Sequence, residues 1–325
     1  GALGFHSTPV VQYIRPEIIG LVLGACIMAM VSGEFKARGG SAPITRFILA
    51  VFVMIGCLMF LGCPFRMILR LAGGDGNAIF GFVGFALGIF AGVFFLKRGY
   101  TLKRSYKMPA LEGQLFPVLQ IVFLILLVAA PAFIHFSTEG PGSLHASVWI
   151  ALAAGLIVGG LAQKTRLCMV GGIRDAVLFR EWKLLMGFVA IFASALVMNL
   201  ILGAVTGTPF FNPGFAGQPV AHTDGLWNAL GMFLAGFGCV LLGGCPLRQL
   251  VLAGQGSSDA GMTVIGMFVG AALCHNLGLA SSGTAADAEG VITAGAATPA
   301  GKVACIICIV VLFIIAFVGN KRKTA

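Results

Sequence analysis

Charged residues are scarce in this chain. Asp, Glu, Lys and Arg together make up 10% of its 325 residues, whereas 58% of the residues are hydrophobic. A folded water-soluble globule needs more polar surface than this composition can supply. The scarcity therefore excludes the soluble globular classes and predicts an all-α polytopic membrane protein.

Motifs that would define an enzyme or an ATP-driven pump are also missing. The chain contains no Walker-type motif, so any pumping must draw on an ion gradient or on consumption of the product inside the cell. Its 9 cysteines do not show the spacing of a structural zinc site, and neither Cys63 nor Cys245 has a second cysteine at Cys-x-x-Cys spacing. We therefore expect no metal, no cofactor and no catalytic residue.

Long apolar runs are abundant. A helix needs about 20 apolar residues to cross a hydrocarbon core of about 30 Å, and on that criterion we expect about nine transmembrane helices. Their predicted ranges are 17–32, 44–62, 78–96, 114–135, 146–163, 184–205, 226–244, 261–280 and 302–319.

The basic residues gather between the predicted spans. The net charge is +10, but no single soluble face carries it, which argues against nucleic-acid binding. Loops rich in Lys and Arg lie in the cytoplasm, whereas loops 136–145, 207–225 and 281–298 contain neither residue. This predicts an external N-terminus and a cytoplasmic C-terminus. The basic clusters are Lys36 with Arg38 and Arg46, then 97–107, 164–183 and 321–323.

One motif, Gly-Cys-x5-Cys-Pro-x-Arg, occurs twice. It covers residues 56–66 and 238–248, each time at the end of an apolar run. Glycine pairs in the spans that follow, at 84/88 and 266/270, keep the same offset. Because the copies end the second and the seventh predicted spans, they enter the membrane from opposite sides. This predicts an inverted-topology repeat with the substrate site at the repeat interface.

The repeat predicts how the chain is divided. We assign residues 1–113 to the first repeat, 114–145 to a linking helix, and 146–325 to the second repeat with a C-terminal helix. The second repeat starts with a span and a cysteine-bearing segment, 163–175, that have no counterpart in the first. We therefore expect the first repeat to be truncated at its N-terminus, lacking one helix and one such segment.

Each copy of the motif ends in Cys-Pro, which is a helix start. Proline is favoured at the first helical position, because its missing N–H is not needed there and its φ is already helical. Pro64 and Pro246 should therefore begin helices that Cys63 and Cys245 cap.

These helices should be short. They are predicted over 64–71 and 246–252, where Gly73 and Gly254 would stop them in the left-handed conformation. Helices of this length cannot span a membrane. We interpret them as re-entrant half-helices, which are tolerated where they line an enclosed or watery cavity.

Arg66 and Arg248 come three residues after the two capping cysteines. Helical spacing places each guanidinium on the same side as its thiol. A helix N-terminus attracts anions, and an ionisable residue at membrane depth is functional by default. The pattern indicates an anion site, although snorkelling of each arginine or a structural ion pair with Asp75 or Asp259 is an alternative.

Cys168 is a third candidate for the substrate pathway. It follows Arg166 at the cytoplasmic end of the fifth predicted span, and we assign both residues to the pathway. The alternative is an ordinary interfacial cysteine, since cytoplasmic membrane ends normally carry Arg and Lys. Other cysteines should pack as small hydrophobes, and His275 should be a core histidine. These packing cysteines are Cys26, Cys57, Cys239, Cys305 and Cys308.

The sequence resembles the YeeE/YedE sulfur-transport family of bacterial inner-membrane proteins over nearly its whole length. The resemblance rests on both Cys-Pro-x-Arg turns and on Gly155-x3-Gly159-x6-Arg166-x-Cys168 with Gly172-x-Arg174-Asp175. The stretches 13–20 and 63–75 are most similar to the YedE branch, whose members are assigned to selenium transport.

The resemblance implies a role for the cysteines. In the family, cysteines along a central pathway pass thiosulfate through the membrane, and by motif that role falls on Cys63, Cys245 and Cys168. The family's N-terminal cysteine segment has no match here, which agrees with the expected truncation.

We therefore expect a bacterial inner-membrane importer of a small sulfur- or selenium-containing anion, and not an enzyme. The expected partners are the anion, the lipid bilayer and a cytoplasmic sulfur or selenium carrier protein. The alternative is a membrane sulfurtransferase or redox enzyme that forms a persulfide or selenosulfide on cysteine. A structural subunit would leave the duplicated arginines unexplained.

Overall fold

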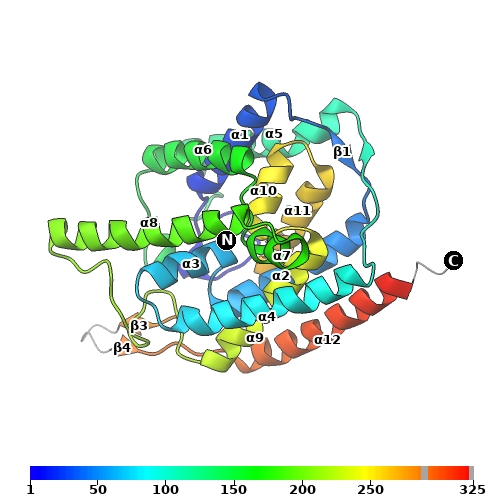
Figure 1. The fold of residues 1–325 in the computed structure, drawn as a ribbon. Helices are drawn as coiled ribbons and strands as arrows, with labels where there is room; N and C mark the ends of the chain where they lie inside the picture. The colour runs from blue at the N-terminus through cyan, green and yellow to red at the C-terminus, as the bar shows by residue number, and fades with distance from the viewer. Residues whose placement is uncertain (287–291, 322–325) are drawn as a thin grey trace. The chain divides into compact units, whose positions relative to one another are not determined.

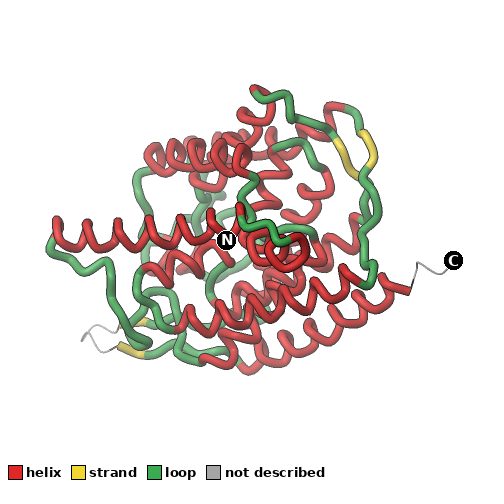
Figure 2. The backbone as a smooth tube through the Cα atoms, in the orientation of Figure 1, coloured by secondary structure: helices red, strands yellow, loops and turns green. Residues whose placement is uncertain are grey.

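The computed structural model describes residues 1–286 and 292–321. This part of the chain is mostly helical (Figure 1), with short antiparallel strand pairs that Figure 2 shows in yellow. The helices are α1 (Pro16–Val31), α2 (Pro43–Phe60), α3 (Pro64–Ala72), α4 (Asn77–Lys97), α5 (Ala110–Ala129), α6 (Val148–Thr165), α7 (Met169–Phe179), α8 (Lys183–Thr206), α9 (Gly225–Leu242), α10 (Pro246–Gly254), α11 (Ser258–Asn276) and α12 (Pro299–Lys321). Two 3-10 turns, η1 (Pro9–Val11) and η2 (Gly140–Gly142), and the strand pairs β1 (Arg38–Gly39) with β2 (Tyr106–Lys107) and β3 (Ala285–Ala286) with β4 (Ile292–Thr293) complete the described elements.

Within the described residues, 9 stretches are long and apolar enough to cross a membrane. This confirms the predicted all-helical polytopic fold. Three of the stretches, Pro43–Ala72, Val148–Phe179 and Gly225–Gly254, each join a long helix to a short one. The sidedness, the inverted repeat and the re-entrant character of the short helices stay predictions. Residues 322 and 323 of the last basic cluster lie outside the described residues.

The fourth span differs from its predicted range. The apolar pattern indicated 114–135, but α5 covers Ala110–Ala129. Ala130 adopts a left-handed φ of 40° and Pro131 follows it. Proline disfavours a helical conformation in the residue before it and cannot continue a helix. The apolar character continues past this point, whereas the helix does not.

The chain forms two compact units that are interleaved in sequence. The first unit consists of Gly1–Ile48, Leu102–Leu167 and Pro246–Asn276, and the second of Leu49–Thr101, Cys168–Cys245 and Leu277–Ala325. Each unit is thus assembled from three separate stretches. The predicted repeat boundaries at residues 113 and 145 divide the chain by internal sequence similarity, whereas the two units divide it by contacts. The repeat boundaries stay predictions.

In the first unit, α1 packs closely along α6. A Cβ added at Gly24 would run into the main chain of Leu156, and one added at Gly159 would run into that of Leu21. Small residues at membrane helix interfaces let two backbones approach each other. The Gly155-x3-Gly159 motif therefore has a packing role.

In the second unit, α4 packs along α9, and Figure 1 shows α12 beside them. A Cβ at Gly84 would meet the main chain of Ala229, and one at Gly88 would meet that of Phe233. The two helices touch because these positions carry no side chain. Aromatic rings fill the space between α4, α9 and α12, contributed by Phe95, Phe237 and Phe313.

The helix α8 is largely uncovered. Phe188 is its one buried residue among those described, and most of its other side chains are apolar. Such a surface suits contact with lipid. Within the second unit, a polar contact ties α8 to α3: Asn199 Nδ2 donates to the carbonyl of Ala72, the last residue of α3, at 3.1 Å.

Candidate functional site

Short helices begin at both Cys-Pro sites, at Pro64 in α3 and at Pro246 in α10. The first predicted glycine stop is wrong by one residue. Gly73 keeps a right-handed φ of −83°, and Gly74, with φ 93°, is the left-handed residue. The N–H of Gly73 still bonds the carbonyl of Leu69 at 3.0 Å, so the helical turn continues for one more residue.

The second stop is displaced in the same direction. Gly254 is the last residue of α10, and the left-handed φ of 99° falls on Gly256. The N–H of Gly256 bonds the carbonyl of Ala253 at 3.2 Å and so extends the turn. Arg248, the third residue of α10, is half-buried.

The break before each short helix has the same backbone conformation in both copies of the motif. Leu61 and Gly243 occupy the same place in the two copies, and both are left-handed, with φ of 61° and 85°. In each turn the next glycine donates its N–H to the carbonyl of the motif's first cysteine, at 2.8 and 2.9 Å. Glycine adopts this conformation readily. Leucine does not, so the first turn is strained.

Cys63 caps α3 through its backbone. Its carbonyl accepts the N–H of Met67 at 2.9 Å, while its half-buried side chain makes no capping hydrogen bond. The side chain of Arg66 folds back over the same turn, because a Cβ added at Gly62 would lie 3.1 Å from the arginine Cδ. The turn thus presents a thiol with an arginine side chain beside it.

Cys168 is also a helix cap. The helix α7 starts directly after it, and its sulfur accepts the N–H of Gly171 at 3.3 Å. The backbone N–H and the thiol of Cys245 also hydrogen-bond with Cys168. Both cysteines are buried. Two of the three predicted pathway cysteines are therefore in direct contact, each at the residue that precedes a short helix.

Two cysteines that were expected to pack as small hydrophobes belong to the same cluster. Cys239 is fully buried and interacts electrostatically with Cys57, Cys63 and Cys168. Helical spacing indicated that the first cysteine of each motif faces partly away from the second. The left-handed residue between them ends the helix and therefore changes that spacing.

The two arginines that flank Cys168 have different partners. Arg166 ends α6, and its guanidinium lies 3.2 Å from the carboxylate of Glu34, with 64% of the arginine side chain exposed. Arg174 interacts electrostatically with Cys168, and its Nε donates to Asp175 Oδ1 at 2.7 Å. In the second unit, the cation that acts on Cys168 is thus Arg174, which the motif analysis did not place in the pathway.

Each of the two buried aspartates has a partner outside the two motifs. Asp75 is bound by Arg70, with Nε 2.6 Å from Oδ2. Asp259 accepts the backbone N–H of Ser41 at 3.0 Å. The alternative of structural ion pairs for Arg66 and Arg248 stays a prediction.

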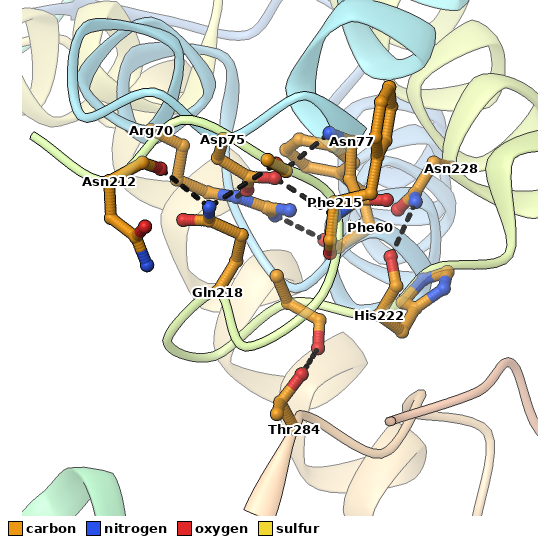
Figure 3. Close-up of polar contacts among 12 residues, drawn as sticks. Phe60, Arg70, Asp75, Asn77, Asn212, Phe215, Gln218, His222, Asn228 and Thr284 are labelled. Atoms are coloured by element: carbon orange, nitrogen blue, oxygen red, sulfur yellow. Dashed lines mark hydrogen bonds and ion pairs between the residues drawn. The ribbon is translucent and has the colours of Figure 1, made fainter. Parts of the chain in front are cut away.

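Figure 3 shows a buried polar network at the ends of α2 and α3. Besides the contact with Asp75, Arg70 donates from Nη1 to the carbonyl of Phe60 at 2.7 Å, and its guanidinium lies 4.1 Å from the centre of that ring. Asp75 Oδ1 accepts the N–H and the side-chain amide of Asn77 at 2.9 and 3.0 Å. The carboxylate is thereby held on both oxygens.

His222 forms another part of this network. Its Nε2 lies 2.7 Å from the carbonyl oxygen of Met59, and its Nδ1 lies 3.3 Å from the backbone nitrogen of Asp224. A carbonyl only accepts and an N–H only donates, so the ring is neutral with its proton on Nε2. Burial of the ring, with the cations of Arg70 and Lys302 nearby, lowers the pKa of His222.

The sequence pattern gave little sign of this network, because its members come from separate loops. Arg70 and Asp75 stand next to the first motif, and a charge at membrane depth is itself a signal. Nothing in the sequence near His222 connects it to the end of α2. Within the described residues, no group of three or more His, Cys, Asp or Glu side chains is placed to hold a metal ion.

The fold and the site together define a class: a polytopic helical membrane protein in which buried thiols meet at the starts of short helices. Residues 164–325 match the model of a family described as sulphur transport, and this part of the chain belongs to that family. The matched part contains Cys168 and Cys245. The match confirms the family resemblance that the motifs carried.

A curated relative supports the same assignment. The chain is 32% identical over 114 residues to a protein named thiosulfate transporter TsuA from Spirochaeta thermophila. The aligned segment is 35% of this chain and 32% of the relative, so the match spans about a third of the relative's length.

Proposed function

We propose that this protein imports a small sulfur- or selenium-containing anion, thiosulfate-like in its chemistry, across the bacterial inner membrane along a pathway lined by cysteines. The observation that carries the proposal is the contact between Cys168 and Cys245. Backbone N–H groups at helix starts favour negative charge. Thiols add weak hydrogen bonds that a soft terminal chalcogen can accept.

The proposal assigns roles to the residues around this contact. Cys63, Cys168 and Cys245 line the path, while Arg66 and Arg248 attract the anion and Arg174 stands beside Cys168. We assign Arg166 a smaller role than the motif predicted, because its side chain is exposed and paired with Glu34. The proposal also keeps the C-terminus in the cytoplasm. The imported anion leaves the pathway on that side, where a sulfur or selenium carrier protein or a consuming enzyme removes it.

Uptake by cells that express the full-length protein and lack other routes tests the proposal. Labelled thiosulfate, selenite and selenide are compared, with sulfate as the control, because sulfate has thiosulfate's charge but no terminal sulfur. We expect uptake of at least one chalcogen species and none of sulfate. Absence of uptake for all three would contradict the proposal.

The same contact also favours a second function, a membrane sulfurtransferase, because it places a second thiol beside the first. In that reaction a cysteine thiolate attacks the sulfane sulfur of thiosulfate. The thiosulfate S–S bond breaks, sulfite leaves with the electron pair, and the cysteine becomes a persulfide. The second thiol then attacks the cysteine-bound sulfur, so that hydrosulfide leaves and a disulfide forms.

Thiosulfate labelled separately at its two sulfur atoms distinguishes these functions. A transporter delivers both labels to the cytoplasm in equal amounts. A sulfurtransferase delivers only the sulfane label and leaves labelled sulfite outside. Mass spectrometry should then find an added sulfur atom on Cys168 or Cys245 in the second case alone.

A further inference from the structure

The break between α2 and α3 leaves the end of α2 without the donors that a continuing helix would supply. α2 ends at Phe60, Leu61 turns left-handed, and Pro64 begins α3 without an N–H. The last carbonyls of a helix need donors from elsewhere, and because Met59 and Phe60 are fully buried, leaving their carbonyls unpaired would be costly. The break therefore depends on partners from other segments.

Two of these carbonyls are met by loops that are distant in sequence. The N–H of Ser281 donates to the carbonyl of Leu58 at 3.2 Å. The carbonyl of Met59 accepts from His222 Nε2 and from the Ser281 hydroxyl, both at 2.7 Å. The loops that contain His222 and Ser281 thus supply the donors for these two carbonyls at the end of α2.

The third carbonyl is met from within α3. Arg70 donates from Nη1 to Phe60, so one side chain bridges the break and joins the end of α2 to the body of α3 (Figure 3). The Asp75 carboxylate accepts a hydrogen bond from Nε of the same guanidinium, and the side-chain amide of Asn77 donates to Asp75. Asn77 is itself fixed by donating to the carbonyl of Phe215 at 2.7 Å. We call Arg70, Asp75 and Asn77 the break brace.

The brace occurs in the copy of the motif whose turn is strained. In the second copy Gly243 takes the left-handed conformation without strain, and the position equivalent to Arg70 is occupied by Leu252. In the first copy the left-handed residue is Leu61. A residue in this conformation persists only where the surrounding structure holds it there.

We propose that Arg70 is a positioning residue: it holds the strained Leu61 turn closed and thereby fixes Cys63, which lies two residues further on. The proposal rests on the proposed function only for the use of Cys63 in transport. The position of Cys63 can be measured without any transport.

The test removes the brace without leaving a buried charge. Arg70→Met combined with Asp75→Asn deletes both charges, since removing one partner alone would strand the other. The asparagine oxygen can still accept from Asn77. In membrane vesicles, the rate of alkylation of Cys63 by N-ethylmaleimide is followed by site-resolved mass spectrometry, with the buried Cys305 as the internal reference.

We expect alkylation of Cys63 to become roughly tenfold faster in the double variant, because the Phe60 carbonyl loses its donor and the turn opens. Cys305 should react as before. Arg15→Met is the matched control, because Arg15 forms an exposed pair with Glu17 at 3.2 Å. It should leave both rates unchanged.

A third substitution shows whether the brace acts through the strained turn. Leu61→Gly removes the strain, so adding it to the double variant should return the Cys63 rate toward the wild-type value. An unchanged Cys63 rate in the double variant, equal acceleration at Cys305, or no slowing on adding Leu61→Gly would each overturn the proposal. If wild-type protein takes up no chalcogen anion, the proposed function fails while the alkylation rates still decide the role of Arg70.

Discussion

His222 donates from Nε2 to the carbonyl oxygen of Met59 across 2.7 Å, and the histidine ring is fully buried. The bond connects the loop before α9 to the last turn of α2. Protonation of the ring would place a hydrogen on Nδ1, where the N–H of Asp224 already points. Two donors would then face each other. The fold therefore requires the neutral ring.

Stability should fall in mild acid for this reason. Burial lowers the pKa of His222 in the folded protein, so the unfolded chain binds a proton at pH values where the folded one does not. The stabilisation is complete above about pH 6.5, the ordinary histidine value, and is lost as the pH falls toward the folded-state pKa. Thermal unfolding in detergent should show a midpoint that decreases over this range.

His222→Gln isolates this residue from the other histidines. The glutamine amide can still donate to the carbonyl of Met59, but it does not titrate in this range. We expect the variant's unfolding midpoint to depend less on pH than that of the wild type. The same dependence in both proteins would assign the effect to another group.

Arg174 and Arg166 should differ sharply in their effect on uptake. Arg174→Gln removes the cation beside Cys168 and should reduce uptake of the transported anion by at least about tenfold, which corresponds to about 1.4 kcal/mol. Arg166→Gln breaks only an exposed pair with Glu34, and such pairs contribute about 0–1 kcal/mol. Comparable losses in the two variants, at equal protein level in the membrane, would contradict the assignment.

Cys245→Ser should separate folding from transport. Serine can cap a helix and can hydrogen-bond with Cys168, so the protein should accumulate in the membrane at normal levels. The hydroxyl cannot replace a soft sulfur along the path, and we expect uptake to be abolished. Cys305→Ser, at another buried cysteine, is the control for substitution as such. Wild-type uptake by Cys245→Ser would exclude a role of the thiol in the pathway.

Arg248→Lys should lose more transport than its retained charge suggests. A guanidinium binds an oxyanion through two parallel hydrogen bonds, whereas an ammonium acts as a point charge. We expect a higher KM for uptake in the lysine variant. If lysine and arginine give the same KM, the residue contributes only positive potential.

Close packing of α4 against α9 should make Gly88 intolerant of any side chain. Gly88→Ala places a methyl group against the main chain of Phe233 and should lower stability by about 1–3 kcal/mol, as overpacking does. Gly187→Ala is the matched control, because a Cβ there would meet nothing within 4 Å. Its unfolding midpoint in detergent should not fall, since alanine favours a helix over glycine.

Features that depend on neighbouring residues followed from the sequence. The nine spans found among the described residues come from long apolar runs, and the starts of α3 and α10 come from the geometry of proline at Pro64 and Pro246. The glycine stops were displaced by one or two residues because Gly73 and Gly256 still make helical hydrogen bonds. Local rules locate such an ending but do not fix its last residue.

Features that depend on tertiary contacts did not follow from the sequence. The helix α7 begins with Met-Val-Gly-Gly, and adjacent glycines disfavour a helix. It forms because Cys168 caps it and because Gly171 and Gly172 pack against Leu184. The contact between Cys168 and Cys245, like that between His222 and Met59, joins residues that no local pattern links.

The interleaving of the two compact units constrains how the protein is made. The first unit needs Pro246–Asn276 and the second needs Leu277–Ala325 to complete its contacts. Neither unit can therefore close while the ribosome is still synthesising the middle of the chain. The helix α4 must wait in the bilayer for its partner α9, which is synthesised much later, so assembly of the second unit is largely a post-insertional event.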